Sequence, residues 1–144
     1  RTYTQFMDHP IENIEVGQTL HLREDIILRV LFTDEKGVVL WLEWENFSAL
    51  LPAGKVGDAW LAVQEAPDVL LLPDDVGNVD FPLSLTNIWS PRVILLPLNP
   101  SDLPLIGQHD LVTVLAGYPL MITLDHGWVK ISTDGDQIWV EAER

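Results

Sequence analysis

The sequence predicts an α/β fold, in which a mixed β-sheet is flanked by helices and followed by a C-terminal β-hairpin or meander. Short runs of branched and aromatic residues, separated by turn residues, fill the first half and are typical of strands. From Leu50 onward, strand-like and helix-like segments alternate, which favours parallel strand pairing. The end of the chain returns to short strand runs joined by turn residues.

Four strands are predicted in the first half, at residues 19–24, 26–32, 37–44 and 47–52. The segment TDEKG between the second and third of them predicts a hairpin turn. Within the run WLEWE, Glu43 and Glu45 alternate with Trp44. This period of two is that of a solvated strand face, so we expect no acid–base role for the two glutamates.

Helices are expected between the strands of the second half. Residues 56–66 predict a short helix, because Asp58 can cap it and apolar residues follow at Trp60, Leu61 and Val63. Further helices are predicted at residues 81–89 and 107–117, and buried strands at residues 68–72 and 92–98.

The tail predicts three more strands, at residues 120–124, 128–132 and 137–143, joined by the tight turns DHG and TDGD. No internal repeat or linker interrupts the sequence. We therefore expect one domain over residues 1–144, with residues 1–10 as a disordered tail. The chain does not begin with Met, so we expect it to be a piece of a longer protein.

Composition narrows the classes of function. Hydrophobic residues make up 47% of the chain, which is too many for a disordered protein. The net charge of −14 and the scattered positions of the 8 basic residues argue against direct binding to DNA. Cysteine is absent, so the chain has no disulfide, thiolate nucleophile or cysteine zinc site. No apolar run is long enough for a transmembrane segment.

Polar residues follow three of the predicted strands. Lys55 follows the run FSALLPAG, Asp74 and Asp75 follow DVLLLP, and Asn99 follows RVILLPL. Ligands of α/β sheets bind outside the carboxyl ends of the strands. If the three strands are neighbours, these four side chains share one edge of the sheet.

The order of the segments carries a family resemblance. The runs IEVGQTLHLREDIILRVL, GVVLWLEWENFSALLPAGK, APDVLLLPDDVG, SPRVILLPLNP and YPLMITLDHGWVKISTDG follow one another along the chain. This series resembles the second half of the metallo-β-lactamase-like domain at the C-terminal end of DNA-internalisation competence proteins, the ComEC family. The likeness covers almost the whole chain from about Ile11 onward. It implies a metallo-β-lactamase-like half domain as the fold.

The motifs that bind metal in the family are altered here. By the resemblance, the slot of the family motif TGD ends in Lys55, the paired histidines of HHGS are replaced by Asp74 and Asp75, and the histidine of HP is replaced by Asn99. The family motif HxHxDH is not in this chain. We therefore expect no zinc site, since zinc prefers imidazole and thiolate ligands. The hypothesis is that Lys55 forms an ion pair with the two aspartates where the family has its metal.

Three functions follow from the resemblance. The first is a non-catalytic, extracytoplasmic module of a DNA-uptake channel, with a structural role or a role in holding another part of the channel. The second is a metal-dependent phosphodiesterase or nuclease with a shifted ligand set. The third is a regulatory module that binds a hard cation such as Mn²⁺, Mg²⁺ or Ca²⁺ at Asp74, Asp75 and Asp80. The first is preferred because every ligand position is altered.

The remaining candidate residues have simpler explanations. Neighbouring side chains diverge on a helix or turn, so we expect no catalytic pair from His109 with Asp110 or from Asp125 with His126. His9 and His21 are expected at the surface. The six tryptophans are expected in the core or at sheet edges, because aromatic side chains bury large areas. Finally, a half domain leaves one sheet face uncovered, which predicts self-association through that face.

Overall fold

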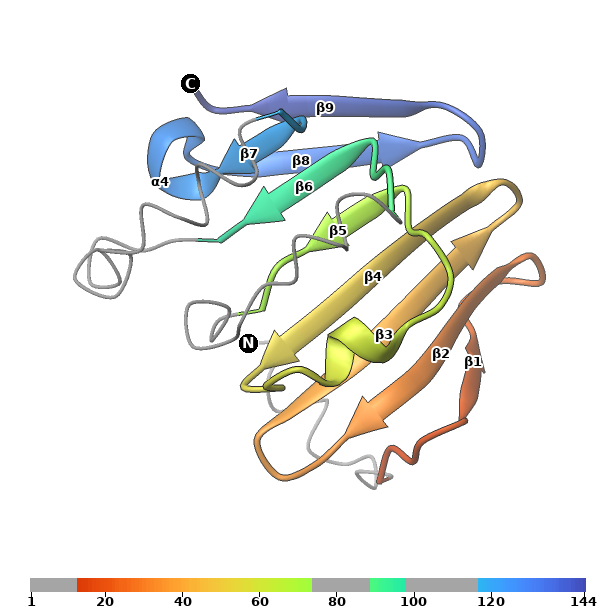
Figure 1. The fold of residues 1–144 in the computed structure, drawn as a ribbon. Helices are drawn as coiled ribbons and strands as arrows, with labels where there is room; N and C mark the ends of the chain where they lie inside the picture. The colour runs from red at the N-terminus through yellow and green to blue at the C-terminus, as the bar shows by residue number, and fades with distance from the viewer. Residues whose placement is uncertain (1–12, 74–88, 98–116) are drawn as a thin grey trace, which may run out of the picture.

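The computed structural model describes residues 13–73, 89–97 and 117–144. Figure 1 shows the elements in this order: β1 (Thr19–His21), β2 (Ile26–Thr33), β3 (Gly37–Trp44), β4 (Phe47–Gly54), the 3₁₀ turn η1 (Ala59–Ala62), β5 (Val69–Leu71), β6 (Val93–Leu96), β7 (Leu120–Ile122), the one-turn helix α4 (Thr123–His126), β8 (Val129–Thr133) and β9 (Ile138–Ala142). No helix of the described residues has the length and apolar character that crossing a membrane requires.

Seven strands form one mixed sheet in the order in which they occur along the chain, from β1 to β7. Strands β1 to β4 pair antiparallel through short turns. Strands β4 to β7 pair parallel. The sequence predicted this change from hairpins to parallel pairing after Leu50. From that point the segments between predicted strands are longer than hairpin turns, as parallel pairing requires.

The predicted α/β fold with flanking helices is wrong for the described structure. Strands make up 48% of it and helices 8%. Where a helix was predicted at residues 56–66, the chain forms only the η1 turn, in which Asp58 makes no side-chain cap and Val63 is already extended. A helix must offset its costly first turn, and this segment lacks that cap. The predicted helices at 81–89 and 107–117 lie outside the described residues, apart from the last residue of each.

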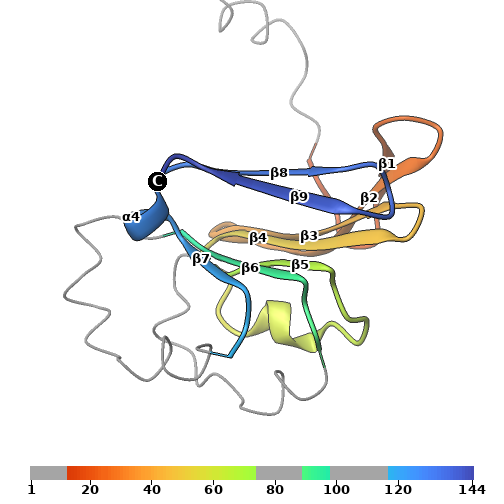
Figure 2. The ribbon, with the colours of Figure 1, turned by 90° about the horizontal axis from the view of Figure 1, so that it is seen from above.

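The predicted three-stranded C-terminal meander is also wrong. Strand β7 pairs with β6 in the large sheet, whereas β8 and β9 form a separate two-stranded sheet. The segment DHG, predicted as a turn, forms the last two residues of α4 and the glycine that ends it. The amide of Gly127 donates to the carbonyl of Thr123 at 2.8 Å. In Figure 2, α4 carries the chain from the plane of the large sheet to the layer of the hairpin. The predicted turn TDGD is confirmed between β8 and β9.

The front face of the large sheet, on the side of η1 in Figure 1, carries the main core. Its centre is formed by side chains of the middle strands and by two tryptophans from the connections, namely Val39, Trp41, Leu50, Trp60, Leu70, Leu72, Trp89, Ile94 and Leu96. Trp60 on η1 is fully buried against these strands. Burial of that one indole therefore explains why the segment turns back over the sheet at all.

A β-bulge decides which side chains of β2 reach this core. Val30 pairs with Leu40, but Phe32 pairs with Val39, so the register shifts between them. Because one extra residue is inserted, both Leu31 and Phe32 pack against the front core. Strict alternation would have placed Phe32 on the back face.

The back face is covered in part by the hairpin of β8 and β9, which forms a second layer in Figure 2. Ile131 and Ile138 of the hairpin pack against a small cluster formed by Phe47, Ala49, Val69 and Val93. Two hydrogen bonds fix the hairpin turn to the sheet. The amide of Asn46 donates to the carbonyl of Gly135 at 2.9 Å, and Nη1 of Arg92 donates to the carbonyl of Asp136 at 2.7 Å.

The substitution Leu50→Ala tests the front core. Leu50 is fully buried at the centre of the sheet, so its truncation leaves a cavity that neighbouring strands cannot close. We expect the free energy of unfolding in a denaturant titration to fall by about 2–5 kcal/mol. A loss below about 1 kcal/mol would show that Leu50 is not at the centre of a packed core.

The substitution Asp134→Ala tests the hairpin turn. Oδ1 of Asp134 accepts the amides of Gln137 and Asp136 at 2.8 and 3.0 Å, and these bonds lower the pKa of Asp134 below its ordinary value of 3.8. A carboxyl with a lowered pKa in the folded state stabilises above its unfolded pKa and loses this effect as the pH falls through its folded pKa. We expect a lower melting temperature for the variant at pH 7, and a difference that begins to shrink near pH 3.8 and is lost only below the lowered pKa of the folded state. An equal difference in melting temperature at pH 7 and below the folded-state pKa would contradict this role of the ionised carboxylate.

Candidate functional site

The predicted strand-end site depends on three strands being neighbours, and they are. Strand β4 pairs parallel with β5, and β5 with β6, so their carboxyl ends meet at one edge of the sheet. Lys55 follows β4 with an exposed side chain, and its amide donates to the carbonyl of Lys36 at 3.1 Å. Asp74, Asp75, Asp80 and Asn99 lie outside the described residues. The ion pair of Lys55 with the two aspartates therefore stays a prediction.

The histidines and acidic residues of the described chain do not gather into a metal site. Across residues 13–73, 89–97 and 117–144, no group of three or more histidine, cysteine, aspartate or glutamate side chains could hold an ion. His21 is exposed on β1, as expected. In α4, Nδ1 of His126 contacts the carbonyl oxygen of Ile122 at 3.0 Å, whereas Asp125 is exposed. His9, His109 and Asp110 lie outside the described residues.

The tryptophans divide into three groups: three are buried, one is half-buried and two are exposed. Trp41, Trp60 and Trp89 are buried, which confirms the prediction of a core role for these three. Trp44 is half-buried and donates from its indole nitrogen to Asp25 at 2.8 Å. The prediction of burial is wrong for Trp128 and Trp139 on the hairpin, which are 55% and 49% exposed.

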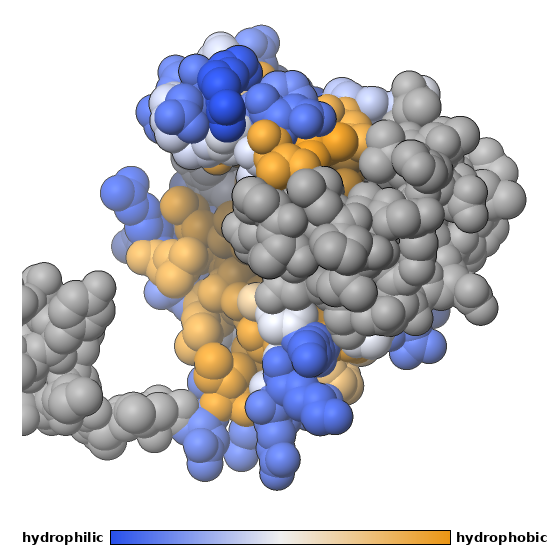
Figure 3. Space-filling view, turned by 90° about the vertical axis from the view of Figure 1, so that its left-hand side faces the viewer, coloured by the Kyte–Doolittle hydropathy of each residue, from blue (hydrophilic) through white to orange (hydrophobic). Residues whose placement is uncertain are grey.

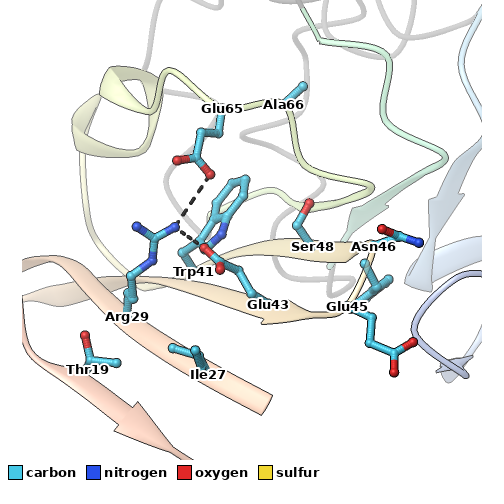
Figure 4. A pocket seen from close by; sticks show the side chains of 11 residues that line it. Thr19, Ile27, Arg29, Trp41, Glu43, Glu45, Asn46, Ser48, Glu65 and Ala66 are labelled. Atoms are coloured by element: carbon cyan, nitrogen blue, oxygen red, sulfur yellow. Dashed lines mark hydrogen bonds and ion pairs between the residues drawn. The ribbon is translucent and has the colours of Figure 1, made fainter. Parts of the chain in front are cut away.

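The sequence did not reveal a hollow of about 630 Å³ on the front face, beside the end of β3. Strands β1, β2, β3 and β4 and the segment after η1 supply its walls, as Figure 4 shows. Its polar side chains are those of Thr19, Arg29, Glu43, Glu45, Asn46, Ser48 and Glu65. These residues come from β1, from β2, from the hairpin of β3 and β4 with its turn, and from the segment after η1. The sheet register brings them together.

Arg29 lies at the centre of this hollow. Its Nη2 forms an ion pair with Glu43, which lies diagonally across on β3, two residues after the register partner Trp41, and a second contact of 3.5 Å with Glu65. Arg29 and Glu43 are each a little over one-third exposed, whereas Glu65 is 63% exposed. Glu43 was expected on a solvated strand face, and the structure corrects this, because Glu43 shares its face with the buried Trp41.

Two hydrogen-bond donors beside the hollow are left without acceptors. Trp41 is only 3% exposed, and its Nε1 is buried with no partner. Nε of Arg29 is buried and unpaired in the same way. Arg29 and Trp41 are direct register partners on β2 and β3, so the two side chains start from adjacent positions on the front face. Buried donors without acceptors cost about 1–3 kcal/mol each, and they mark a place where an acceptor is missing.

One signal in the sequence could have identified this site. Arg29 interrupts the otherwise apolar run of residues 26–32, and an arginine inside a predicted strand requires partners. The partners themselves could not be identified, because Glu65 is 36 positions away along the chain and reaches Arg29 only after η1 has folded back over the sheet.

A second candidate surface is the back face of the large sheet. The register and the alternation of side chains place apolar residues at its positions on β2 to β7, with no charged residue among them. Many of them are only half-buried, namely Leu28, Leu40, Leu42, Leu51, Leu71, Leu95 and Met121. Four of these, Leu42, Leu51, Leu95 and Met121, pack against the same cluster as the hairpin. Figure 3 views the molecule from the left-hand side of Figure 1, along the edge of the sheet, and shows hydrophobic side chains gathered below a hydrophilic region at the top. This surface is suited to contact with another apolar surface.

Comparison with known proteins found no relative of this chain. No family model, no curated protein and no solved structure matches this chain. The resemblance to competence proteins therefore depends on the sequence segments alone, and the function that it implies is a proposal.

A calorimetric titration with Zn²⁺ and then Mn²⁺ tests the strand-end site. Lys55 brings a positive charge to the edge where Asp74 and Asp75 are expected, so we expect no binding of either ion at micromolar concentration. The control is the double variant Asp74→Ala/Asp75→Ala, which should give the same flat titration. Micromolar binding that disappears in the double variant would contradict the expected ion pair and support a metal site.

Proposed function

We propose that this chain is a non-catalytic, extracytoplasmic module of a DNA-uptake channel protein, and that it holds another part of that channel. The sequence resemblance supplies the link to DNA uptake. The apolar back face of the sheet is the observation that supports binding, because side chains of this kind are stabilised by being removed from water.

The back face has the chemistry of a contact surface between folded parts. Its apolar side chains belong to rigid, paired strands, so little conformational freedom is lost when a partner covers them. The hairpin packs against the cluster around Phe47 and Val93, which Leu42, Leu51, Leu95 and Met121 also contact. Leu28 and Leu40 lie further along the same face and are half-buried.

The charge of the chain determines the kind of partner. With 22 acidic and 8 basic residues, the module repels other acidic surfaces, DNA included. A partner therefore presents an apolar patch bordered by lysine and arginine. A second copy of the chain has the apolar face but not the basic border, so a part of the channel itself is the favoured partner.

The substitution Leu40→Gln tests this proposal in the intact import protein. It replaces an apolar side chain of the back face with a polar one of similar size, and it leaves the net charge unchanged. We expect DNA uptake by the host to fall about tenfold, since truncating a central contact costs about 1–2 kcal/mol. The purified variant should retain its melting temperature to within a few degrees.

The matched control is Leu22→Gln, which makes the same exchange at a leucine that is 59% exposed in the loop after β1. Uptake at the normal level is expected with this control. Equal uptake in both variants would overturn the proposed contact. Cleavage of DNA by the purified chain with Mn²⁺, abolished by Asp74→Ala, would instead establish the nuclease reading, and dimers that Leu40→Gln dissociates would make a second copy the partner.

A further inference from the structure

Two hollows on the front face share three residues. The larger, of about 630 Å³, lies toward β1 and the turn between β3 and β4, and the smaller, of about 290 Å³, lies toward η1. Arg29, Trp41 and Glu65 line both. The contact between Arg29 and Glu65 joins the sheet to the segment after η1, as Figure 4 shows. This contact therefore divides what would otherwise be one groove.

The floor of this groove offers donors and no acceptor for them. Nε1 of Trp41 and Nε of Arg29 can only donate hydrogen bonds, and both are buried without a partner. Their residues are register partners, and both side chains line the two hollows. A ligand that satisfies this pair brings an oxygen with free lone pairs, such as a carbonyl oxygen.

The walls of the groove are acidic. Glu43, Glu45 and Glu65 line the larger hollow, and Arg29 is the basic residue among its lining side chains. Arg29 is already paired with two of these glutamates. A ligand carboxylate or phosphate would be repelled there, whereas an ammonium or guanidinium group would be attracted.

We propose that this groove binds an extended, basic segment of a peptide. A main-chain carbonyl oxygen of the peptide accepts a hydrogen bond from Nε1 of Trp41, and a lysine or arginine side chain pairs with Glu65. The hollows lie on the front face, whereas the proposed channel contact uses the back face, so this site is independent of the proposed function.

The groove opens by movement of Glu65. Its side chain is 63% exposed and reaches Arg29 at 3.5 Å, and an exposed contact of this kind contributes little to stability. When Glu65 turns outward, the barrier between the two hollows is removed, and in the proposed complex the peptide carbonyl then approaches Nε1 of Trp41. Arg29 stays in place through its closer contact with Glu43.

The test uses three blocked peptides, acetyl-Gly-Lys-Gly-amide, acetyl-Gly-Gln-Gly-amide and acetyl-Gly-Glu-Gly-amide, titrated into the purified chain at low salt. NMR spectroscopy follows the indole N–H resonance of Trp41, which is assigned by its loss in Trp41→Phe. We expect the lysine peptide to bind at least about tenfold more tightly than the glutamine peptide, and the glutamate peptide to bind more weakly still. The indole resonance should move as the lysine peptide binds, and higher salt should weaken binding.

Two variants separate the groove from the general negative charge of the chain. Glu65→Gln removes one charge from the wall, and Glu141→Gln removes one charge from the exposed face of β9, where Glu141 pairs with Lys130 at 3.3 Å. We expect Glu65→Gln to weaken binding of the lysine peptide several-fold and Glu141→Gln to leave it unchanged. If Trp41→Phe does not fold, the comparison of Glu65→Gln with Glu141→Gln still decides whether the peptide binds in the groove.

Three outcomes would overturn the proposal. The first is equal binding of the three peptides, or no binding of any. The second is an equal loss of affinity in both glutamine variants, which would show attraction to the acidic surface only. The third is binding without movement of the indole resonance, which would place the peptide elsewhere.

Discussion

The pairing of β3 with β2 and β4 is the constraint on which the rest of the structure depends. Successive side chains of a strand point to opposite faces, so this register assigns every residue of β3 to one side. Val39 and Trp41 enter the front core, and Leu40 and Leu42 face the back. A shift by one residue would bring Trp41 out of the core and place Glu43 on the apolar face. Hydrophobic burial on the front face therefore fixes both candidate surfaces at once.

The two faces are completed in different ways. On the front, the η1 turn adds Trp60, and the segment that follows supplies Glu65 to Arg29. On the back, α4 leads the chain out of the large sheet, and the β8–β9 hairpin returns over one part of it. The hairpin is held to the sheet by a few hydrogen bonds and by Ile131 and Ile138. It therefore covers one end of the back face and leaves the remaining apolar positions for another surface.

The sheet register also brings the polar side chains around Arg29 together. The front positions near the end of β3 carry Arg29 and Glu43, beside the fully apolar core. An arginine in that place is tolerated because carboxylates from β3 and from the segment after η1 reach its guanidinium. The indole nitrogen of Trp41 has no such partner. Packing of the large ring outweighs the lost hydrogen bond, since burial of an aromatic side chain contributes more than one such bond.

The sequence by itself determined the strands. Runs such as residues 26–32 and 37–44 have strong local preferences, and TDEKG and TDGD predict the turns between them because turn residues act locally. It also predicted that β4, β5 and β6 could be neighbours, which places Lys55 at their common edge. The helix expected at residues 56–66 failed, because local periodicity does not reveal that one buried tryptophan and a missing cap leave only a single turn.

Only the tertiary structure decided which side chains meet. The bulge after Val30, the separation of β8 and β9 from the large sheet and the contact of Arg29 with Glu65 all depend on residues distant in the sequence. Such contacts form when the whole core excludes water, and no local pattern encodes their geometry. For this reason the pocket around Arg29 and the apolar back face became visible only in the folded chain, although each residue in them can be read from the sequence.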